Sequence, residues 1–168
     1  MSLEGKPFSP AYGTLESLGT LADVWNAGPP MAHFGARLEF DRIDRVRAVI
    51  DPVKSFHRGG MGSDAVNGVV LAGLFDLVIG TVGWLTRPET RSATVNLSMT
   101  FFKATRGERI VAEARLVRAG MNLVFAAAEI FDSAGEVTAR CDGTCAVAHG
   151  KTNSQKIYER MRAGKIVP

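Results

Sequence analysis

The sequence predicts an α+β fold in which an antiparallel sheet of about six strands wraps around one long central helix. Residues 65–85 form an apolar run of helical length, and six other stretches alternate apolar and polar residues as strands do. Glycine lies in the turns between the last four stretches, where short antiparallel connections need it. The 168 residues are 46% hydrophobic and 22% charged, which is enough apolar material for the core of one domain.

The N-terminal part predicts one helix followed by two strands. Apolar residues at helical spacing over residues 13–27 predict an amphipathic helix, which Gly28-Pro29-Pro30 should end. The period then changes to two over residues 33–41, and a second strand is expected over residues 45–50. Asp51-Pro52 should end that strand.

A glycine-rich loop, residues 53–64, precedes the central helix and carries His57 and Arg58. Loops of this kind are where ligand contacts concentrate, so both side chains are candidates for substrate binding. Histidine and arginine in a loop are also common as ordinary surface residues, and the sequence leaves that alternative open.

The predicted central helix is apolar on every face, and Asp76 is its only charged residue. Such a helix is expected to be buried all round, so Asp76 should lie in the interior or line a cavity. Gly73, Gly80 and Gly83 share one stripe with Asp76, and each glycine costs a helix roughly 1 kcal/mol relative to alanine. We therefore expect a partner helix or a ligand to approach the backbone along this stripe.

Two other interpretations compete for this helix. An apolar run of about 20 residues could span a membrane, where small residues also line helix contacts. The flanking strand patterns and the cost of a membrane aspartate, roughly 2.5 to 3.5 kcal/mol, favour a protein that does not enter a membrane. Asp76 could also be a hydrogen-bonded structural residue of the core.

After a polar turn at residues 87–89, four alternating stretches predict the remaining strands, at residues 94–101, 109–116, 122–131 and 137–147. Uniform alternation in the first stretch places Thr94 and Asn96 on one face and Val95 on the other. The third stretch is apolar on both faces, which predicts a central strand covered on both sides. Cys141 and Cys145 are expected to be small buried hydrophobic residues.

Domain organisation follows from these elements: an N-terminal helical segment over residues 1–32, the domain over 33–148, and a basic, solvated tail over 149–168. The net charge of +3 comes without the clustered Lys and Arg that nucleic-acid binding needs. Since no export signal and no metal-ligand spacing are visible, we expect a cytoplasmic protein without a metal or cofactor.

Two segments carry a resemblance to a known family: NGVVLAGLFDLVIG, which starts at Asn67, and SATVNLSMTFFKATRGERIVAEARLVRAG, which starts at Ser92. Over about residues 33–148 the chain resembles the hotdog-fold acyl-CoA thioesterases, in particular the branch of the phenylacetate-pathway (PaaI-like) enzymes. That branch has His-Gly-Gly at the start of the central helix, an acid nine residues after the His, and Ser or Thr opening the next strand. Gly68, Asp76 and Thr94 match this pattern, whereas Asn67 replaces the His and Val69 the second Gly.

The resemblance implies hydrolysis of an acyl-CoA to a carboxylic acid and CoA. The backbone N–H of Gly68 would polarise the thioester carbonyl, Asp76 would act as general base or nucleophile, and Thr94 would hold the water or orient the carboxylate. Eight residues of helix separate Gly68 from Asp76 by about 12 Å, so one thioester cannot touch both in a single copy. We expect a homodimer whose antiparallel helices share two sites, and two dimers could pair further into a tetramer.

The apolar setting suggests a medium-chain or aromatic acyl group. The residues expected to bind substrate are Asn67, Val69, His57, Arg58, Asn96, Lys103 and Arg118, the last two as partners of the CoA phosphates. One alternative is a non-catalytic acyl-CoA-binding domain, which Asn67 and Val69 favour. Another is a hydratase or dehydratase, for which His57 would be the partner of the acid.

Overall fold

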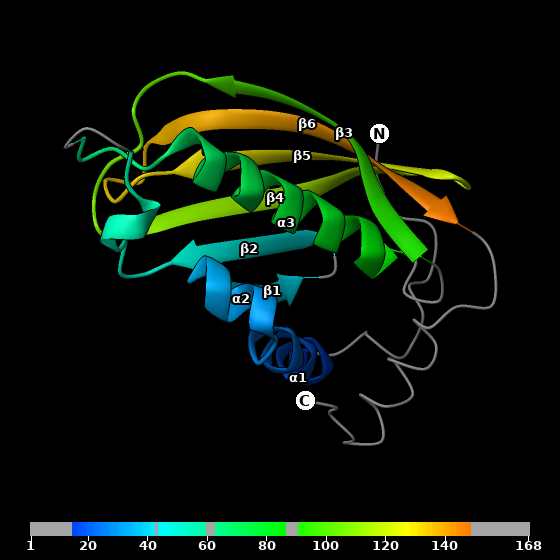
Figure 1. The fold of residues 1–168 in the computed structure, drawn as a ribbon. Coiled ribbons are helices and arrows are strands. Elements are labelled where there is room, and N and C mark those ends of the chain that lie inside the picture. Colours follow the sequence, from blue (N-terminus) through cyan, green and yellow to red (C-terminus); the bar gives the residue numbers. More distant parts are fainter. Residues whose placement is uncertain (1–14, 43, 60–62, 87–90, 149–168) are drawn as a thin grey trace.

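The computed structural model describes residues 15–42, 44–59, 63–86 and 91–148. Two short helices precede the first two strands, a 3-10 turn leads to the central helix, and four strands complete the chain (Figure 1). These elements are α1 (Leu15–Asn26), α2 (Pro29–Phe34), β1 (Arg37–Arg42), β2 (Arg45–Ile50), η2 (Ser55–His57), α3 (Gly68–Thr86), β3 (Arg91–Phe101), β4 (Ile110–Ala119), β5 (Leu123–Phe131) and β6 (Val137–Ala148).

The strands form one six-stranded sheet in the order β1-β2-β4-β5-β6-β3, and every neighbouring pair is antiparallel. The sheet curves around α3, which lies across its inner face, while α1 and α2 lie beside β1 (Figure 1). The predicted α+β fold, a sheet of six strands around one helix, is therefore confirmed. In this order β1 and β3 are the two edge strands.

The core lies between α3 and the inner face of the sheet. One side of α3 is completely buried against β2, β3, β4, β5 and β6. Each of these large side chains contributes roughly 1.5 to 3 kcal/mol through burial; they include Leu74, Phe75, Val78, Ile79 and Val82. By length and hydropathy α3 could cross a membrane, but in this fold it is the core helix of the sheet.

The two N-terminal helices are fastened to the domain at two points. Asn26 at the end of α1 bonds both backbone groups of Leu38 in β1: its Nδ2 donates to the carbonyl oxygen at 2.9 Å and its Oδ1 accepts from the N–H at 2.7 Å. The Trp25 and Trp84 rings, from α1 and α3, lie 5.5 Å apart between centroids. Leu18 and Leu21 complete this packing as buried residues of α1.

The structure corrects the boundary predicted at residue 33. Pro29 and Pro30 end α1 as expected, but they also open the six-residue helix α2, because proline suits the first turn of a helix. Gly35 ends α2 in the left-handed conformation, with φ of 64°. The first strand consequently begins at Arg37 rather than at His33.

Two burial predictions are wrong. The central helix is not buried all round, because the sheet covers only one side; along the other runs the open stripe, formed by Val69, Ala72, Gly73, Asp76, Leu77, Gly80 and Trp84, all exposed or half-buried. The interior strand β5 is covered only on its inner face, and Leu123 and Phe125 are exposed on the other. The polar turn at 87–89 and the basic tail at 149–168 lie outside the described residues.

Candidate functional site

Asp76 lies on the open stripe of α3 and is exposed in the single chain. Of the two positions expected for it, the interior or the lining of a cavity, the interior is therefore wrong for the single chain; Asp76 is the only charged residue of α3. Gly73 precedes it by three residues and Gly80 follows by four, so both neighbour it on the helix surface. Whatever contacts those two glycines also borders the carboxylate.

The glycine stripe is occupied by side chains of the same chain. A Cβ built on Gly73 would lie 2.6 Å from the Phe34 ring, and one on Gly80 would lie 3.3 Å from the Thr94 hydroxyl. At Gly83 the corresponding distance to the Cys145 sulfur is 2.8 Å. The expected close approach to the helix backbone is real, and within the single chain residues of α2, β3 and β6 make it.

Thr94 reaches the helix because β3 contains an extra residue. Thr94 pairs with Cys145, whereas Asn96 pairs with Thr144, so Val95 between them is bulged out of the ladder. Cys145 faces α3, where its thiol donates to the carbonyl oxygen of Ile79 at 3.6 Å, and Thr94 opposite it faces the helix too. The bulge therefore places Thr94 and Asn96 on opposite faces, which uniform alternation did not predict.

The Cys145 thiol completes the surroundings of Thr94. Burial raises the pKa of this thiol, the hydroxyls of Thr94 and Ser92 beside it act in the opposite direction, and the charge of Asp76 adds to the increase. Cys141 and Cys145 are both free and buried, as the sequence predicted.

The first turn of α3 presents an unused backbone donor. Asn67 precedes the helix and caps it: its Oδ1 accepts from the N–H of Val69 at 2.9 Å, and its carbonyl oxygen accepts from Val70 and Leu71. The N–H of Gly68 has no acceptor among the described residues, and a Cβ on Gly68 would meet open space. Val69 is 78% exposed beside it. An oxygen atom could therefore approach the Gly68 N–H directly.

His57 lies away from solvent, contrary to the expectation for a ligand-contacting loop. Its ring is 2% exposed, Nδ1 accepts from the N–H of Lys54 at 2.9 Å, and Nε2 lies 3.0 Å from the carbonyl oxygen of Phe34. Because Nδ1 accepts, Nε2 carries the proton and donates it to Phe34. Both ring nitrogens are thus engaged within the chain, which gives His57 a structural role and not that of the acid/base partner expected of it in a hydratase.

Two other predicted substrate contacts are held by ion pairs. Arg58 bonds Glu108 at 2.6 Å and donates to the carbonyl oxygen of Asp64 at 2.7 Å, which ties its loop to the start of β4. Lys103 pairs with Glu136 and lies 3.8 Å from Asp132. The hydrogen bond to Glu136 raises the pKa of Lys103. Neither cation lies on the open stripe of α3.

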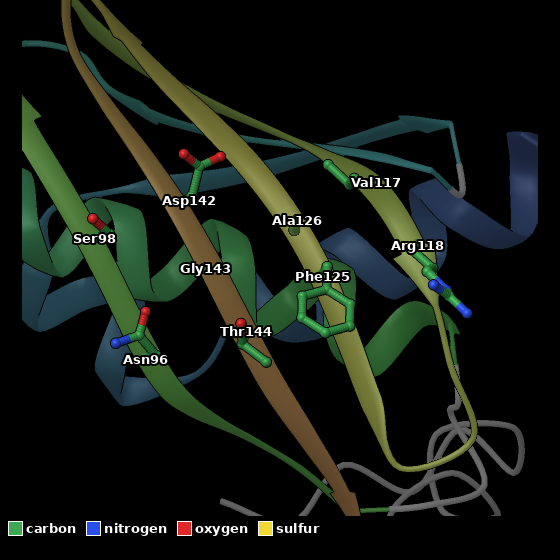
Figure 2. Close-up of a pocket in the computed structure, with 9 residues that line it drawn as sticks. All are labelled: Asn96, Ser98, Val117, Arg118, Phe125, Ala126, Asp142, Gly143 and Thr144. Atoms are coloured by element: carbon green, nitrogen blue, oxygen red, sulfur yellow. The ribbon is translucent and has the colours of Figure 1, made fainter. Parts of the chain in front are cut away.

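Asn96 and Arg118 lie on the outer face of the sheet, away from α3. Gly143 faces the helix, since a Cβ on it would meet Ile79 at 2.7 Å, so Asp142 and Thr144 on either side of it face outward. Pairing aligns Asn96 and Phe125 with Thr144, and Arg118 with Phe125. They line a hollow of about 410 Å³. Figure 2 shows the side chains that surround it. The sheet therefore separates Asn96 and Arg118 from Asp76.

The predicted residues thus do not gather at one site. The catalytic candidates Gly68, Asp76 and Thr94 lie along α3 with Asn67 and Val69, while the remaining candidates lie elsewhere. Sequence reasoning missed Phe34 because it assigned that residue to a strand; the signal for a bulky neighbour was Gly73 itself, a glycine inside a helix. Within the described ranges, no group of three or more His, Cys, Asp or Glu side chains could hold a metal ion.

Comparison with known proteins shows which of them share this fold. Three solved structures with the same fold are a thioesterase family protein from Silicibacter pomeroyi (23% identity, TM-score 0.69, 78% of this chain and 97% of that one), the PaaI protein of the E. coli phenylacetic acid degradation operon (12%, 0.68, 79% and 94%), and zebra fish thioesterase superfamily member 2 (19%, 0.67, 80% and 99%). By sequence, no protein of curated function matches the chain.

The family model described as the thioesterase superfamily matches residues 64–139, which run from the loop before α3 into β6. That span contains Gly68, Asp76 and Thr94. The sheet and its central helix have the hotdog fold of these thioesterase structures, and residues 64–139 are similar to the thioesterase superfamily.

Proposed function

We propose that this protein hydrolyses an acyl-CoA thioester to the free acid and CoA, with Asp76 as general base or nucleophile. The observation that carries the proposal is the position of Asp76, an exposed carboxylate on an apolar helix with the Thr94 hydroxyl one helical turn away at Gly80. A carboxylate can activate water or attack the carbonyl carbon directly, and a neighbouring hydroxyl can orient either the water or the acid.

The Gly68 N–H is the proposed donor to the thioester oxygen. It lies at the N-terminus of α3, where the helix dipole favours negative charge, and no described residue accepts from it. Asn67 and Val69 do not block this donor: Asn67 is turned back to cap the helix, and Val69 points into solvent. The replacement of the family's usual His and Gly is therefore compatible with an N–H donor at this position.

A second copy of the chain would complete the site. Gly68 and Asp76 are about 12 Å apart along α3. The edge strand β3 exposes Val95, Met99 and Phe101, and a long apolar edge is a template for pairing with another chain. A twofold axis perpendicular to the sheet would pair two β3 strands, keep both α3 helices on one face and reverse one of them. Gly68 of one copy would then approach Asp76 of the other.

The acyl group is proposed to be medium-chain or aromatic. The open stripe offers Val69 and Leu77 as apolar contacts, and the Phe34 ring borders it at Gly73. Such a surface binds hydrocarbon by burial, and Asp76 is the only charged residue on it. With the pairs of Arg58 and Lys103 already formed, Arg118 remains a candidate partner of CoA phosphates only if the nucleotide reaches the outer face.

Asp76→Asn tests the chemistry in a thiol-release assay across a panel of acyl-CoA substrates. We expect kcat to fall by about 100-fold or more, which is what removal of a general base costs, while binding of a non-hydrolysable S-alkyl-CoA persists. Asp142→Asn is the matched control, an exposed carboxylate on the outer face. Undiminished turnover in Asp76→Asn would remove Asp76 from the mechanism; a wild-type protein that binds S-alkyl-CoA without turnover would favour the binding-domain alternative.

Gly68→Pro and subunit mixing test the shared site. Proline is tolerated at the first position of a helix, lacks only the N–H, and meets open space here. Alone, Gly68→Pro and Asp76→Asn should each be inactive. Mixed after reversible unfolding, they should regain about a quarter of wild-type activity, because half of the dimers are mixed and one of their two sites is intact. No recovery in mixtures shown to contain mixed dimers would refute a site built from two chains.

A further inference from the structure

We infer that Phe34 limits the size of the acyl group that can lie beside Asp76, and that His57 is a positioning residue that keeps Phe34 there. The inference rests on the proposed function, because it concerns the substrate of the same site. It gives a role to two residues that the catalytic scheme does not use.

The Phe34 ring is seated directly on the helix backbone. The ring is half-buried against the core, and two of its carbons lie 2.6 and 2.8 Å from the position of a Cβ on Gly73. Any side chain at residue 73 would occupy this seat. Because Gly73 and Asp76 are three residues apart, the ring stands beside the carboxylate on the open stripe.

The backbone of Phe34 is held from the other side. Its carbonyl oxygen accepts the Nε2 proton of His57 at 3.0 Å, and the opposite ring nitrogen is fixed by the N–H of Lys54 at 2.9 Å. The next residue, Gly35, has φ of 64°, and a Cβ on it would lie 2.9 Å from Nε2. The imidazole therefore packs against the end of α2 and bonds to it, which restricts where the Phe34 ring can go.

Together these contacts border Asp76 on two sides. Phe34 stands at Gly73 toward the start of α3, and Thr94 stands at Gly80 toward its end. An acyl chain whose carbonyl reaches Asp76 passes between these two side chains. Of the two, Phe34 is larger and more apolar than Thr94. Replacing the ring by a methyl group would uncover more of the open stripe next to Gly73 without altering Asp76, Thr94 or Gly68.

Phe34→Ala and Phe34→Leu are compared with wild type by kcat/KM on straight-chain acyl-CoA substrates and by calorimetric affinity for the matching S-alkyl-CoA thioethers. We expect longer chains to be favoured over shorter ones by about tenfold or more in Phe34→Ala, since a few methylenes in an apolar pocket are worth that much. Phe34→Leu should be intermediate. Phe102→Ala, an exposed phenylalanine just after β3, is the control and should leave both profiles unchanged.

His57→Gln retains an amide that can donate to the Phe34 carbonyl but loses the ring. It should shift the chain-length profile in the same direction as Phe34→Ala, and the double variant should behave like Phe34→Ala alone. Unchanged profiles in folded Phe34→Ala would overturn the inference. Absence of turnover in wild type would refute the proposed thioesterase, and the thioether affinities would then still decide whether Phe34 limits the ligand.

Discussion

Gly73→Ala, made in wild type and in Phe34→Ala, measures how firmly the Phe34 ring is held on α3. In the wild type the new methyl group would lie 2.6 Å from the ring, so the ring must move by about an ångström, and overpacking of this kind costs about 1 to 3 kcal/mol. Alanine also gains about 1 kcal/mol of helix propensity. We expect a net loss of about 1 kcal/mol, which lowers Tm by about 2 to 4 °C for a chain of this size.

Without the ring, only the propensity gain remains. In the Phe34→Ala background, Gly73→Ala should therefore stabilise the protein by about 1 kcal/mol, and the two substitutions should couple by about 2 kcal/mol. Urea unfolding of all four proteins at one fixed concentration provides the cycle, because the proposed subunit association would make stability depend on concentration. If Gly73→Ala changes the free energy of unfolding equally in both backgrounds, the Phe34 ring moves aside without cost, and the conclusion that it is held firmly against Gly73 is wrong.

Three further predictions concern the rest of the fold. Asn67→Ala should lower the free energy of unfolding by about 1 kcal/mol through loss of the α3 cap, whereas Asn67→Asp should retain the cap and most of the stability; thermal unfolding of both decides this. Glu113→Gln should destabilise the protein more at low than at high salt, because Arg47 at 2.8 Å and Arg115 at 3.4 Å then repel without a screening carboxylate, and urea curves at two ionic strengths measure it. Burial raises the pKa of the Cys141 thiol from 9.0 to about 11, so between these values the folded state keeps a proton that the unfolded state releases. The free energy of unfolding should therefore fall as the pH rises from 9 to 11. Iodoacetamide at pH 8 should modify Cys141 only after unfolding.

Much of the fold could be predicted from local patterns. The helix, the strands β2 to β6 and the buried cysteines follow from the spacing of apolar residues, because a helix or strand that buries one face must repeat with its own period. The boundary at α2 was missed because Pro29 and Pro30 can both end one helix and open another, and only the left-handed Gly35 shows where the second one stops.

The sequence could predict the chemical groups of the candidate site, but not the side chains that lie around them. Asp76 stands out as the only charge in an apolar helix, and Gly68 stands out by its place at the helix start. The partners of the glycine stripe were assigned to a second molecule, since sequence spacing shows that something approaches a helix but not what approaches it. Phe34, 39 residues before Gly73, is brought there by tertiary packing alone.

By itself the sequence determined the central helix and the strands β2 to β6, and it singled out one carboxylate and one backbone amide as candidates for chemistry. Only the tertiary structure decided that Val95 bulges, so that Thr94 faces α3 and Asn96 faces away from it. It also decided that both ring nitrogens of His57 form hydrogen bonds, to the backbones of Lys54 and Phe34. The physical reason is the range of the interactions. Periodicity and helix capping act between residues a few positions apart, whereas a strand's register and a buried ring's hydrogen bonds depend on segments that meet only when the chain folds.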